Sequence, residues 1–382
     1  MKTSAWCGGT SLVVSLLTSG TLSLPAQTLE CREGSRVRGP EAIGRVESWP
    51  VPSEEVFIGP DARAALLADG SAVLVDRAKN DLIRIDRVSG RVTALARKGE
   101  GPGEIKAVLG LVVGPGDTVA VIDLGNHRIT RWTRAGRLAS AQQYKFLPIP
   151  TFHWQFGVDL IEVTRALGER GKTEDSRMSI RLLGPDSTVT LRTVTLPDPP
   201  SEFGIFTQTG IAAPLGASQV VLATGASPDI LVAGLRGGQE NRVHLAMGDP
   251  IRVDHALATR LVTLASTQIP EASREAIVSG MLQAVPVNPT YPMFSRVVAG
   301  TGGAIWVQRT FSGVEAGPKE PPVTFSMNDL SGYRWEQFNS TGSRMAECLM
   351  PQDWRVLGTG PGWVLFAKDD PDNTHLYTWH PK

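Results

Sequence analysis

The sequence predicts an all-β fold, and three of its features support that prediction. The 382 residues include 40 glycines and 27 prolines but few long stretches of helical period, as expected for a β-rich chain with many tight turns. Short apolar segments are separated by turn residues at intervals of roughly 8 to 12 residues, which is typical of antiparallel meanders. Related meanders also recur, because the turns at Asp69-Gly70 and Gly116-Asp117 lie about 46 residues apart. This is the spacing of a propeller blade, so the sequence predicts a β-propeller.

The clearest meander lies within residues 101–138. An apolar segment at 108–113 leads through a Gly-Pro-Gly-Asp turn into a second apolar strand at 118–122. An Asp-x-Gly-Asn turn, a strand of alternating polarity at 128–133 and a glycine turn follow. Short strands joined in this way form an antiparallel sheet and not a βαβ unit.

The chain is predicted to contain six such units, each a four-stranded antiparallel blade. They lie at residues 62–96, 101–138, 151–196, 211–246, 294–349 and 354–379. The sixth unit has only three strands of its own, whereas residues 45–49 form a β-like segment with no hairpin partner beside it. We expect this N-terminal strand to complete the last blade, since closing the ring in this way leaves only short, protected edges.

One insertion interrupts the ring between the fourth and fifth blades. Leu257, Leu261 and Leu264 recur at helical spacing, and Pro270 stands at a first-turn position of a second segment. Residues 254–284 are therefore predicted to form two short helices. These helices either shield the edge of the sheet core or form a lid over a central pocket.

The N-terminus is expected to lie outside the propeller. Residues 1–26 have a weakly basic start, an apolar stretch and a small residue at a cleavage point, as in a secretory signal peptide. The apolar stretch is shorter than the ~20 residues that span a membrane, so no stable span is expected after cleavage. Residues 27–43 are predicted to be an N-terminal extension and residues 44–382 the propeller. The protein is thus expected to be exported, either to a periplasm or to the extracellular space.

The cysteines support the same compartment. Removal of the signal takes away Cys7 and leaves Cys31 and Cys348. Exported proteins meet an oxidising environment, and an even number of cysteines favours a disulfide. We predict a Cys31–Cys348 bridge; the alternative is two unpaired buried thiols.

Charge and composition exclude some classes of partner. Lys plus Arg and Asp plus Glu number 38 each, which gives a formal net charge of +0 at pH 7. The chain also has no basic run with interleaved aromatic residues. No nucleic-acid partner is therefore expected. Separately, we expect the protein to act as a monomer.

A resemblance to a known family follows from the second unit. The Gly-Glu-Gly-Pro-Gly-Glu stretch at 99–104 and the segment at 121–129 resemble the signature of NHL-type repeats in a bacterial family of six-bladed β-propellers. The segments at 292–294 and 303–307, behind the helical insertion, are similar to the same family, and the likeness covers roughly residues 44–380. The resemblance implies the fold and export, and it implies no settled activity.

The signature residues have a structural interpretation. Asp123 can accept hydrogen bonds from turn amides, and Gly125 or Asn126 can supply a left-handed turn conformation. Arg128 is expected to pair with a carboxylate of the adjacent blade. These residues are therefore predicted to stabilise the fold and not to bind a ligand.

No catalytic motif stands out in the chain. The sequence has no Gly-x-Ser-x-Gly, no His-Glu-x-x-His, no Cys-x-x-Cys and no phosphate-binding loop. Its six histidines lack the spacing of metal ligands. No catalytic residue, metal or cofactor is therefore predicted, although enzymatic activity stays an open alternative.

Ligands of propellers bind where the inner strands converge, so the residues of those strands are the candidates for binding. By the predicted register they include Glu104, Gln155 and Asp353 together with a larger number of basic residues. The candidate binding residues are Arg63, Lys106, His153, Arg296 and Arg355. An excess of arginine suits a carboxylate, sulfate or phosphate group, because the guanidinium binds such anions bidentately. The alternative is that these are solvated charges at strand ends.

Three functions remain open at this stage. The first is an exported, non-catalytic binding or scaffolding propeller, with a small anionic ligand or a protein partner at the central channel mouth or the top-face loops. The second is a metal-dependent enzyme of the lactonase or lyase kind, which would need several converging oxygen ligands. The third is a subunit of a cell-envelope complex that uses the helical insertion and the blade edges.

Overall fold

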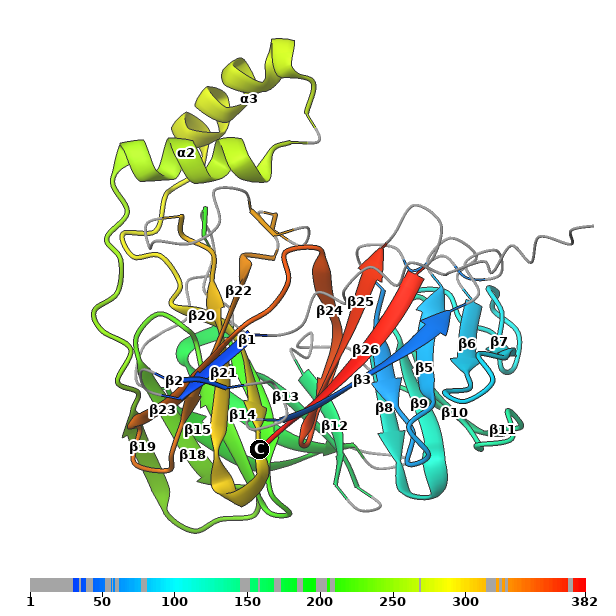
Figure 1. Ribbon diagram of the computed structural model, residues 1–382. Coiled ribbons are helices and arrows are strands. Elements are labelled where there is room, and N and C mark those ends of the chain that lie inside the picture. The colour runs from blue at the N-terminus through cyan, green and yellow to red at the C-terminus, as the bar shows by residue number, and fades with distance from the viewer. Residues whose placement is uncertain are drawn as a thin grey trace, which may run out of the picture.

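The computed structural model is a ring of six antiparallel sheets, with two helices standing on one face (Figure 1). It describes residues 30–33, 36–38, 44–51, 56, 58, 62–76, 81–144, 152–156, 159–167, 173–183, 188–196, 205–206, 210–267, 269–313, 321–322, 325–326, 329–369 and 374–382. The predicted signal peptide, residues 1–26, lies outside these residues. Neither helix in the described part has the length and apolar character needed to cross a membrane.

The first four blades each contain four consecutive strands, numbered here from the central axis to the rim. Blade 1 comprises β4 (Ala64–Leu66), β5 (Ala72–Asp76), β6 (Asp81–Ile85) and β7 (Val92–Ala96), and blade 2 comprises β8 (Val108–Gly114), β9 (Thr118–Asp123), β10 (Arg128–Trp132) and β11 (Leu138–Gln143). Blade 3 comprises β12 (Phe152–Phe156), β13 (Asp159–Leu167), β14 (Thr173–Leu183) and β15 (Thr188–Thr195), and blade 4 comprises β16 (Ile211–Leu215), β17 (Gln219–Ala223), β18 (Asp229–Gly234) and β19 (Glu240–His244). A 3-10 turn, η1 (Pro115–Asp117), links β8 to β9.

The last two blades draw strands from both ends of the chain. Blade 5 comprises β20 (Phe294–Ala299), β21 (Ile305–Thr310), β22 (Ser331–Phe338) and β23 (Arg344–Leu349), with the 3-10 turn η2 (Thr301–Gly303) after β20. Blade 6 comprises β24 (Trp354–Gly360), β25 (Trp363–Asp369), β26 (Thr374–Pro381) and the early strand β3 (Gly44–Val51). The β3 strand pairs with β26 in antiparallel register, with Val46 opposite Trp379. The predicted closure of the ring by the N-terminal strand is thus confirmed.

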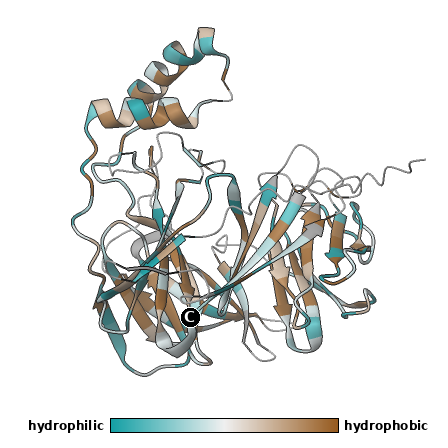
Figure 2. Ribbon diagram, in the orientation of Figure 1, coloured by the Kyte–Doolittle hydropathy of each residue, from teal (hydrophilic) through white to brown (hydrophobic). Residues whose placement is uncertain are grey.

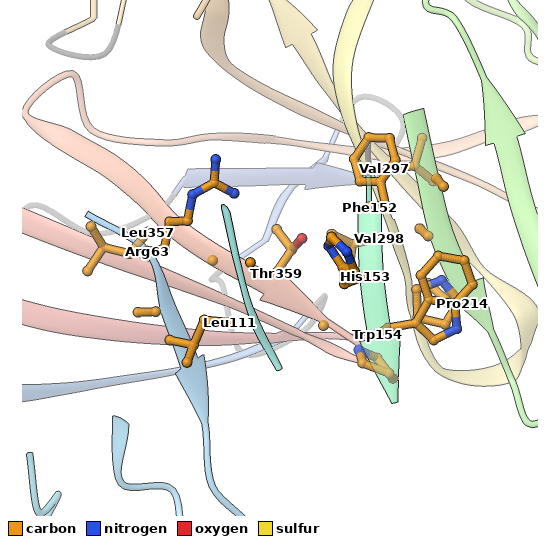
Figure 3. Close-up of a pocket in the computed structure, with 18 of the residues that line it drawn as sticks. Arg63, Leu111, Phe152, His153, Trp154, Pro214, Val297, Val298, Leu357 and Thr359 are labelled. Carbon is orange, nitrogen blue, oxygen red and sulfur yellow. The ribbon is translucent and has the colours of Figure 1, made fainter. Parts of the chain in front are cut away.

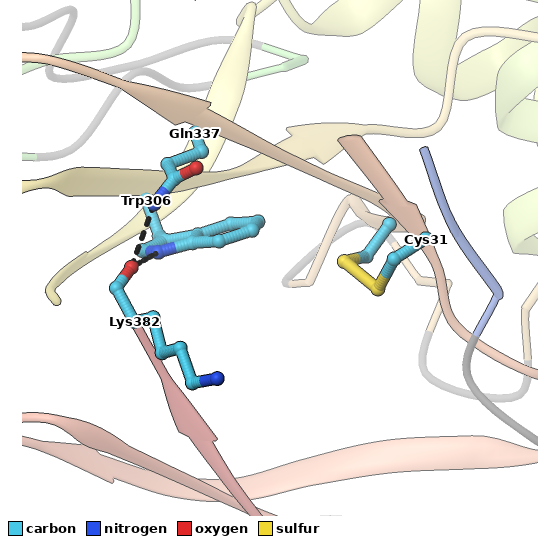
Figure 4. The surroundings of a disulfide bond; sticks show 5 residues. Cys31, Trp306, Gln337 and Lys382 are labelled. Carbon is cyan, nitrogen blue, oxygen red and sulfur yellow. Dashed lines mark hydrogen bonds between the residues drawn. A yellow bond between two sulfur atoms is a disulfide. The ribbon is translucent and has the colours of Figure 1, made fainter. Parts of the chain in front are cut away.

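Blade 5 is larger than the sequence predicted. The segment expected to be an N-terminal extension forms β1 (Glu30–Glu33) and β2 (Arg36–Arg38), and β1 pairs with β23 at the rim of blade 5. This sheet therefore has six strands instead of four. The two cysteines are directly opposite each other in neighbouring strands of this sheet, with Cα atoms 4.0 Å apart. The predicted Cys31–Cys348 disulfide is present (Figure 4).

Lys382, the last residue described, is hydrogen-bonded to blade 5, next to the β26–β3 pair that closes the ring. The carbonyl oxygen of Lys382 accepts hydrogen bonds from Trp306 Nε1 at 3.0 Å and from Gln337 Nε2 at 2.6 Å (Figure 4). Both donors belong to blade 5, whereas β26 belongs to blade 6. These hydrogen bonds therefore join the two blades that complete the ring.

The core lies between neighbouring blades. Each of the six interfaces has its own cluster of buried apolar side chains, because alternate residues of every strand point toward the next sheet. Figure 2 shows the hydrophobic segments concentrated along the strands. The interface between blades 5 and 6 is the most aromatic, and its tryptophans are Trp306, Trp335, Trp354 and Trp379.

The two predicted helices are α2 (His255–Ala265) and α3 (Glu271–Ala284). Asp254 caps α2, since its side chain accepts a hydrogen bond from the Leu257 amide at 2.7 Å. Leu261 of α2 and Val278 of α3 are buried in a cluster that also contains Phe311 and Tyr333 of blade 5. Of the two alternatives for this insertion, these contacts favour a shield over the edge of the sheet core, at blade 5 (Figure 1).

The signature turn of blade 2 is a dense set of backbone contacts around a buried carboxylate. Asp123 is fully buried, and its oxygens accept hydrogen bonds from the amides of Lys106 and Ala107, both at 2.9 Å. The amides of Gly125 and Asn126 also donate to it. The predicted role of Asp123 as an acceptor for turn amides is confirmed. The left-handed conformation expected at Gly125 or Asn126 lies instead at His127, whose φ is 49°.

Arg128 acts differently from the prediction. Its guanidinium donates to the carbonyl oxygens of Gly101 at 2.6 Å, Glu104 at 2.8 Å and Glu100 at 3.1 Å. The expected ion pair with a carboxylate of the adjacent blade was therefore wrong. The fork of the side chain instead ties β10 to the glycine-rich loop that precedes β8.

Replacement of Asp123 by alanine is expected to lower the free energy of unfolding by about 2–4 kcal/mol, because four backbone amides lose the buried carboxylate that accepts from them. Denaturant unfolding followed by circular dichroism measures this loss. Asp86→Ala is the matched control, since Asp86 also accepts hydrogen bonds from turn amides, at Val88 and Ser89, but in an exposed turn. Equal losses for the two variants would contradict the role given to Asp123.

Candidate functional site

A cavity of about 240 Å³ lies at the centre of the ring (Figure 3). Every blade contributes to its wall through its inner strand, or through a residue beside it, so the cavity is a product of ring closure. The lining residues are Arg63, Ala64, Leu109, Gly110, Leu111, Phe152, His153, Trp154, Ala212, Ala213, Pro214, Val297, Val298, Ala299, Leu357, Gly358, Thr359, Gly360 and Pro361. Concave sites that combine apolar and polar groups are typical of small-molecule binding.

Polar and apolar side chains are intermingled around the cavity, since Leu111 and Leu357 lie on the side of Arg63 and His153 lies next to Phe152 (Figure 3). Among the described lining residues, Arg63 and His153 are the ones whose side chains titrate. Thr359 lies between them, and Phe152 and Pro214 lie on the far side from Arg63 (Figure 3). The cavity thus contains one permanent cation among other polar and apolar groups.

His153 lies close to blade 2 because Gly110 of that blade has no side chain. A Cβ atom built on Gly110 would lie 2.9 Å from His153 Nδ1, so any larger residue there would force the ring to move. The His153 side chain is 4% exposed. Its burial, together with the positive charge of Arg63, lowers the pKa of His153 to about 3. The imidazole is therefore neutral near pH 7, and Arg63 carries the charge of this wall.

A buried carboxylate lies behind His153, toward the outside of blade 3. Glu162 is opposite His153 in the β12–β13 register and opposite Arg181 in the β13–β14 register. Glu162 is fully buried, Arg181 Nε lies 3.0 Å from its Oε1, and the Tyr144 hydroxyl donates to its Oε2. Burial raises the pKa of Glu162, while Tyr144 and Arg181 act in the opposite direction.

His153 is near this carboxylate but does not bond to it. Its Nε2 atom lies 3.8 Å from Glu162 Oε2, which is longer than a hydrogen bond. Within the described part of the chain, this buried nitrogen has no hydrogen-bond partner. Glu162 and Arg181 therefore form a buried pair of their own beside the cavity wall.

Two of the five predicted binding residues, Arg63 and His153, lie together in the cavity. Lys106 lies in the glycine-rich loop of blade 2, where its Nζ is 2.5 Å from Glu100 Oε1. Arg296 pairs with Asp329 at 2.9 Å and donates to Gln308 at 2.8 Å. Arg355 is buried and donates to the carbonyl oxygen of Ile58. These three do not line the cavity.

The two carboxylates that the predicted register also placed on the inner strands have basic partners outside the cavity. Glu104 pairs with Arg97 at 3.0 Å, and Asp353 pairs with Lys368 at 3.4 Å. In the residues that the structure describes, no group of three or more His, Cys, Asp or Glu side chains is placed to hold a metal ion.

Sequence reasoning missed Gly110 and Glu162. Gly110 lies inside an apolar strand, and a glycine in a strand interior often marks a close approach of another group. Glu162 is a carboxylate in the middle of an apolar strand whose neighbours are buried. A charge at such a position predicts a buried partner, and that signal could have identified the Glu162 cluster.

Comparison with known proteins reveals similarity at the level of the fold. No protein-family model matches the sequence, and no curated protein matches it significantly, so the resemblance to NHL-type repeats stays a prediction. A protein of Bacteroides fragilis described as exported has a similar structure, with a TM-score of 0.53 and 12% sequence identity, over 89% of this chain and 96% of that one. A member of the DUF4221 family from Bacteroides vulgatus has a TM-score of 0.51 and 10% identity, over 92% of this chain and 98% of that one. At these identities, the likeness shows that the three chains share a fold.

Proposed function

We propose that this protein is an exported, non-catalytic binding propeller that takes a small anionic ligand in its central cavity. The observation that carries the proposal is the position of Arg63 in a cavity to which all six blades contribute. A guanidinium has five N–H donors in a fixed fork that matches the oxygens of an anion. It can therefore keep a contact within the protein and still bind a ligand.

Two further observations support the parts of this proposal. Each inner strand at the cavity is part of a multi-stranded sheet, so the site is formed before a ligand arrives. A preformed site loses little entropy when it binds. Export is supported by the Cys31–Cys348 disulfide, which persists in oxidising compartments, and by the likeness to a protein described as exported.

Thermal unfolding with small anions tests the function. Acetate, benzoate, sulfate and phosphate are added separately at millimolar concentration to the purified protein. A ligand present at about 100 times its Kd stabilises the folded state by about 2.7 kcal/mol, which corresponds to roughly 4 °C in Tm for a chain of this size. We expect at least one of the four anions to raise Tm, and Arg63→Met to abolish that rise.

The matched control is Arg137→Met, which removes an exposed arginine from the turn between β10 and β11, away from the cavity. This variant is expected to respond to anions as the unsubstituted protein does. Two results would contradict the proposal: no anion raises Tm, or Arg63→Met responds as strongly as Arg137→Met.

A further inference from the structure

We propose that the ligand of the central cavity is a hydroxy acid, whose hydroxyl lies away from its carboxylate and donates a hydrogen bond to Nδ1 of His153. This inference rests on the proposed function, in which Arg63 binds the anionic group, and it adds a second group that the ligand must carry. It depends on His153, and it holds with Arg63 keeping its contact within the protein. Three observations lead to it: the unpaired state of His153, the surroundings of its two nitrogens and the glycine beside it.

The first observation is that His153 is buried without a hydrogen-bond partner in the described part of the chain. Its side chain is 4% exposed, and its Nε2 atom is 3.8 Å from Glu162 Oε2, beyond hydrogen-bond distance. Glu162 accepts from Tyr144 and pairs with Arg181 instead. Buried polar groups are normally paired, so an unpaired imidazole in a cavity wall indicates a partner that arrives with a ligand.

The second observation concerns the nitrogen that carries the proton. Glu162 Oε2 is an acceptor, since it takes a hydrogen bond from the Tyr144 hydroxyl, and it lies on the Nε2 side of the imidazole. An N–H opposite such an oxygen is electrostatically favoured over a lone pair, even at 3.8 Å. The imidazole is neutral near pH 7 and therefore has one N–H. We assign this proton to Nε2, which leaves Nδ1 as an acceptor.

The third observation is the absence of a side chain beside that acceptor. Nδ1 is on the side of Gly110, and both residues line the cavity. A Cβ atom on Gly110 would lie 2.9 Å from Nδ1 and would cover it. A glycine inside a strand often marks the close approach of another group. Here it leaves the acceptor uncovered at the cavity wall.

An acceptor in the wall determines what the ligand must bring. An ionised carboxylate has only acceptor oxygens, so the group that meets Nδ1 must be a separate donor. A protonated amine would place a second positive charge near Arg63, whereas a hydroxyl donates without a charge. Thr359, whose side chain is exposed, lies between Arg63 and His153 (Figure 3). The hydroxyl must therefore be several bonds from the carboxylate.

Calorimetric titration at pH 7.5 with five probes of four carbons each tests the inference. 4-Hydroxybutyrate has both groups at a distance from each other, and 2-hydroxybutyrate has them side by side. Butyrate lacks the hydroxyl, 1,4-butanediol lacks the carboxylate, and 4-aminobutyrate replaces the hydroxyl by an ammonium group. 4-Hydroxybutyrate is expected to bind at least about fivefold more tightly than each of the other four, as one added hydrogen bond allows.

Two variants remove the acceptor in different ways. His153→Phe keeps a planar ring without the nitrogens, and Gly110→Ala places a methyl group against Nδ1. In both, 4-hydroxybutyrate and butyrate are expected to bind within about twofold of each other. The matched control is His255→Phe, at the exposed start of α2 and outside the cavity, which should keep the full preference. Unchanged far-ultraviolet circular dichroism shows that each variant is folded.

The tautomer of His153 can be measured without a ligand. Proton–nitrogen correlation spectra of the imidazole, assigned by the signals that His153→Phe loses, distinguish a protonated from an unprotonated ring nitrogen. We expect the proton on Nε2 and a shift of the Nδ1 signal when 4-hydroxybutyrate is added. A proton on Nδ1 would overturn the inference, since this nitrogen could not then accept.

The binding results separate this inference from the proposed function. If butyrate or 2-hydroxybutyrate binds as tightly as 4-hydroxybutyrate, and Arg63→Met abolishes the binding, the function stands and the inference is wrong. The same conclusion follows if His153→Phe keeps the preference for 4-hydroxybutyrate. If no probe binds and no anion raises Tm, both the inference and the proposed function fail.

Discussion

Replacement of Trp379 by alanine is expected to destabilise the protein by about 3–5 kcal/mol, the usual cost of removing a large aromatic side chain from a core. Trp379 is fully buried in β26, between β25 and the closing strand β3. Its ring makes edge contacts with Trp306, at a centroid distance of 4.8 Å, and with Trp335, at 5.6 Å. Such pairs add roughly 0.5–1.5 kcal/mol each beyond the area they bury. The substitution therefore removes a buried side chain of blade 6 and its contacts with two tryptophans of blade 5.

Guanidinium-induced unfolding, followed by circular dichroism, measures this loss. Trp363→Ala is the matched control, because Trp363 belongs to the same blade but is only partly buried. We expect the control to lose less than half as much stability as Trp379→Ala. If the free energy of unfolding falls by the same amount in both variants, the interface between blades 5 and 6 contributes no more to stability than the rest of blade 6.

Much of the fold could be predicted because its signals are local. Turn residues at Asp69-Gly70 and Gly116-Asp117 and the short apolar segments between such turns identify individual strands. Closure could be predicted by counting, since the last unit lacked a strand and residues 45–49 lacked a partner. The pairing of β26 with β3 is consistent with that count.

The additional strands of blade 5 could not be predicted, for a physical reason. The β1 strand reads Glu-Cys-Arg-Glu, which has neither the apolar alternation nor the β-branched residues of a typical strand. It is a strand because the edge of β23 is free to pair with it and because Cys31 meets Cys348 there. Such a contact between distant segments leaves no periodic pattern in the sequence.

Only part of the candidate site could be predicted, because contacts between distant segments again leave no pattern in the sequence. The register of a strand indicates which residues lie near the axis, and it identified Arg63 and His153. It does not indicate which charges find partners within the protein. Arg296 meets Asp329, and Arg355 meets a backbone carbonyl, through contacts between segments that are distant in sequence. The cavity itself depends on the arrangement of all six blades around the axis, which no single strand encodes.

Removal of the disulfide by the double substitution Cys31→Ala and Cys348→Ala is expected to lower the free energy of unfolding by about 2–4 kcal/mol. The bridge joins residues separated by 317 positions, so it constrains nearly the whole unfolded chain, and the entropy that it removes grows with the length of the loop. Both cysteines are fully buried, and alanine avoids burying an unpaired hydroxyl.

Two measurements identify how the disulfide acts. Denaturant unfolding reports the global loss, and amide hydrogen exchange in Glu30–Glu33 reports whether β1 stays paired with β23. If the bridge stabilises mainly through the unfolded state, the double variant loses global stability while the β1 amides stay protected. Rapid exchange of the β1 amides with unchanged global stability would show instead that the bridge only anchors the rim of blade 5. In that case the loss of stability in Trp379→Ala should be the same with and without the disulfide.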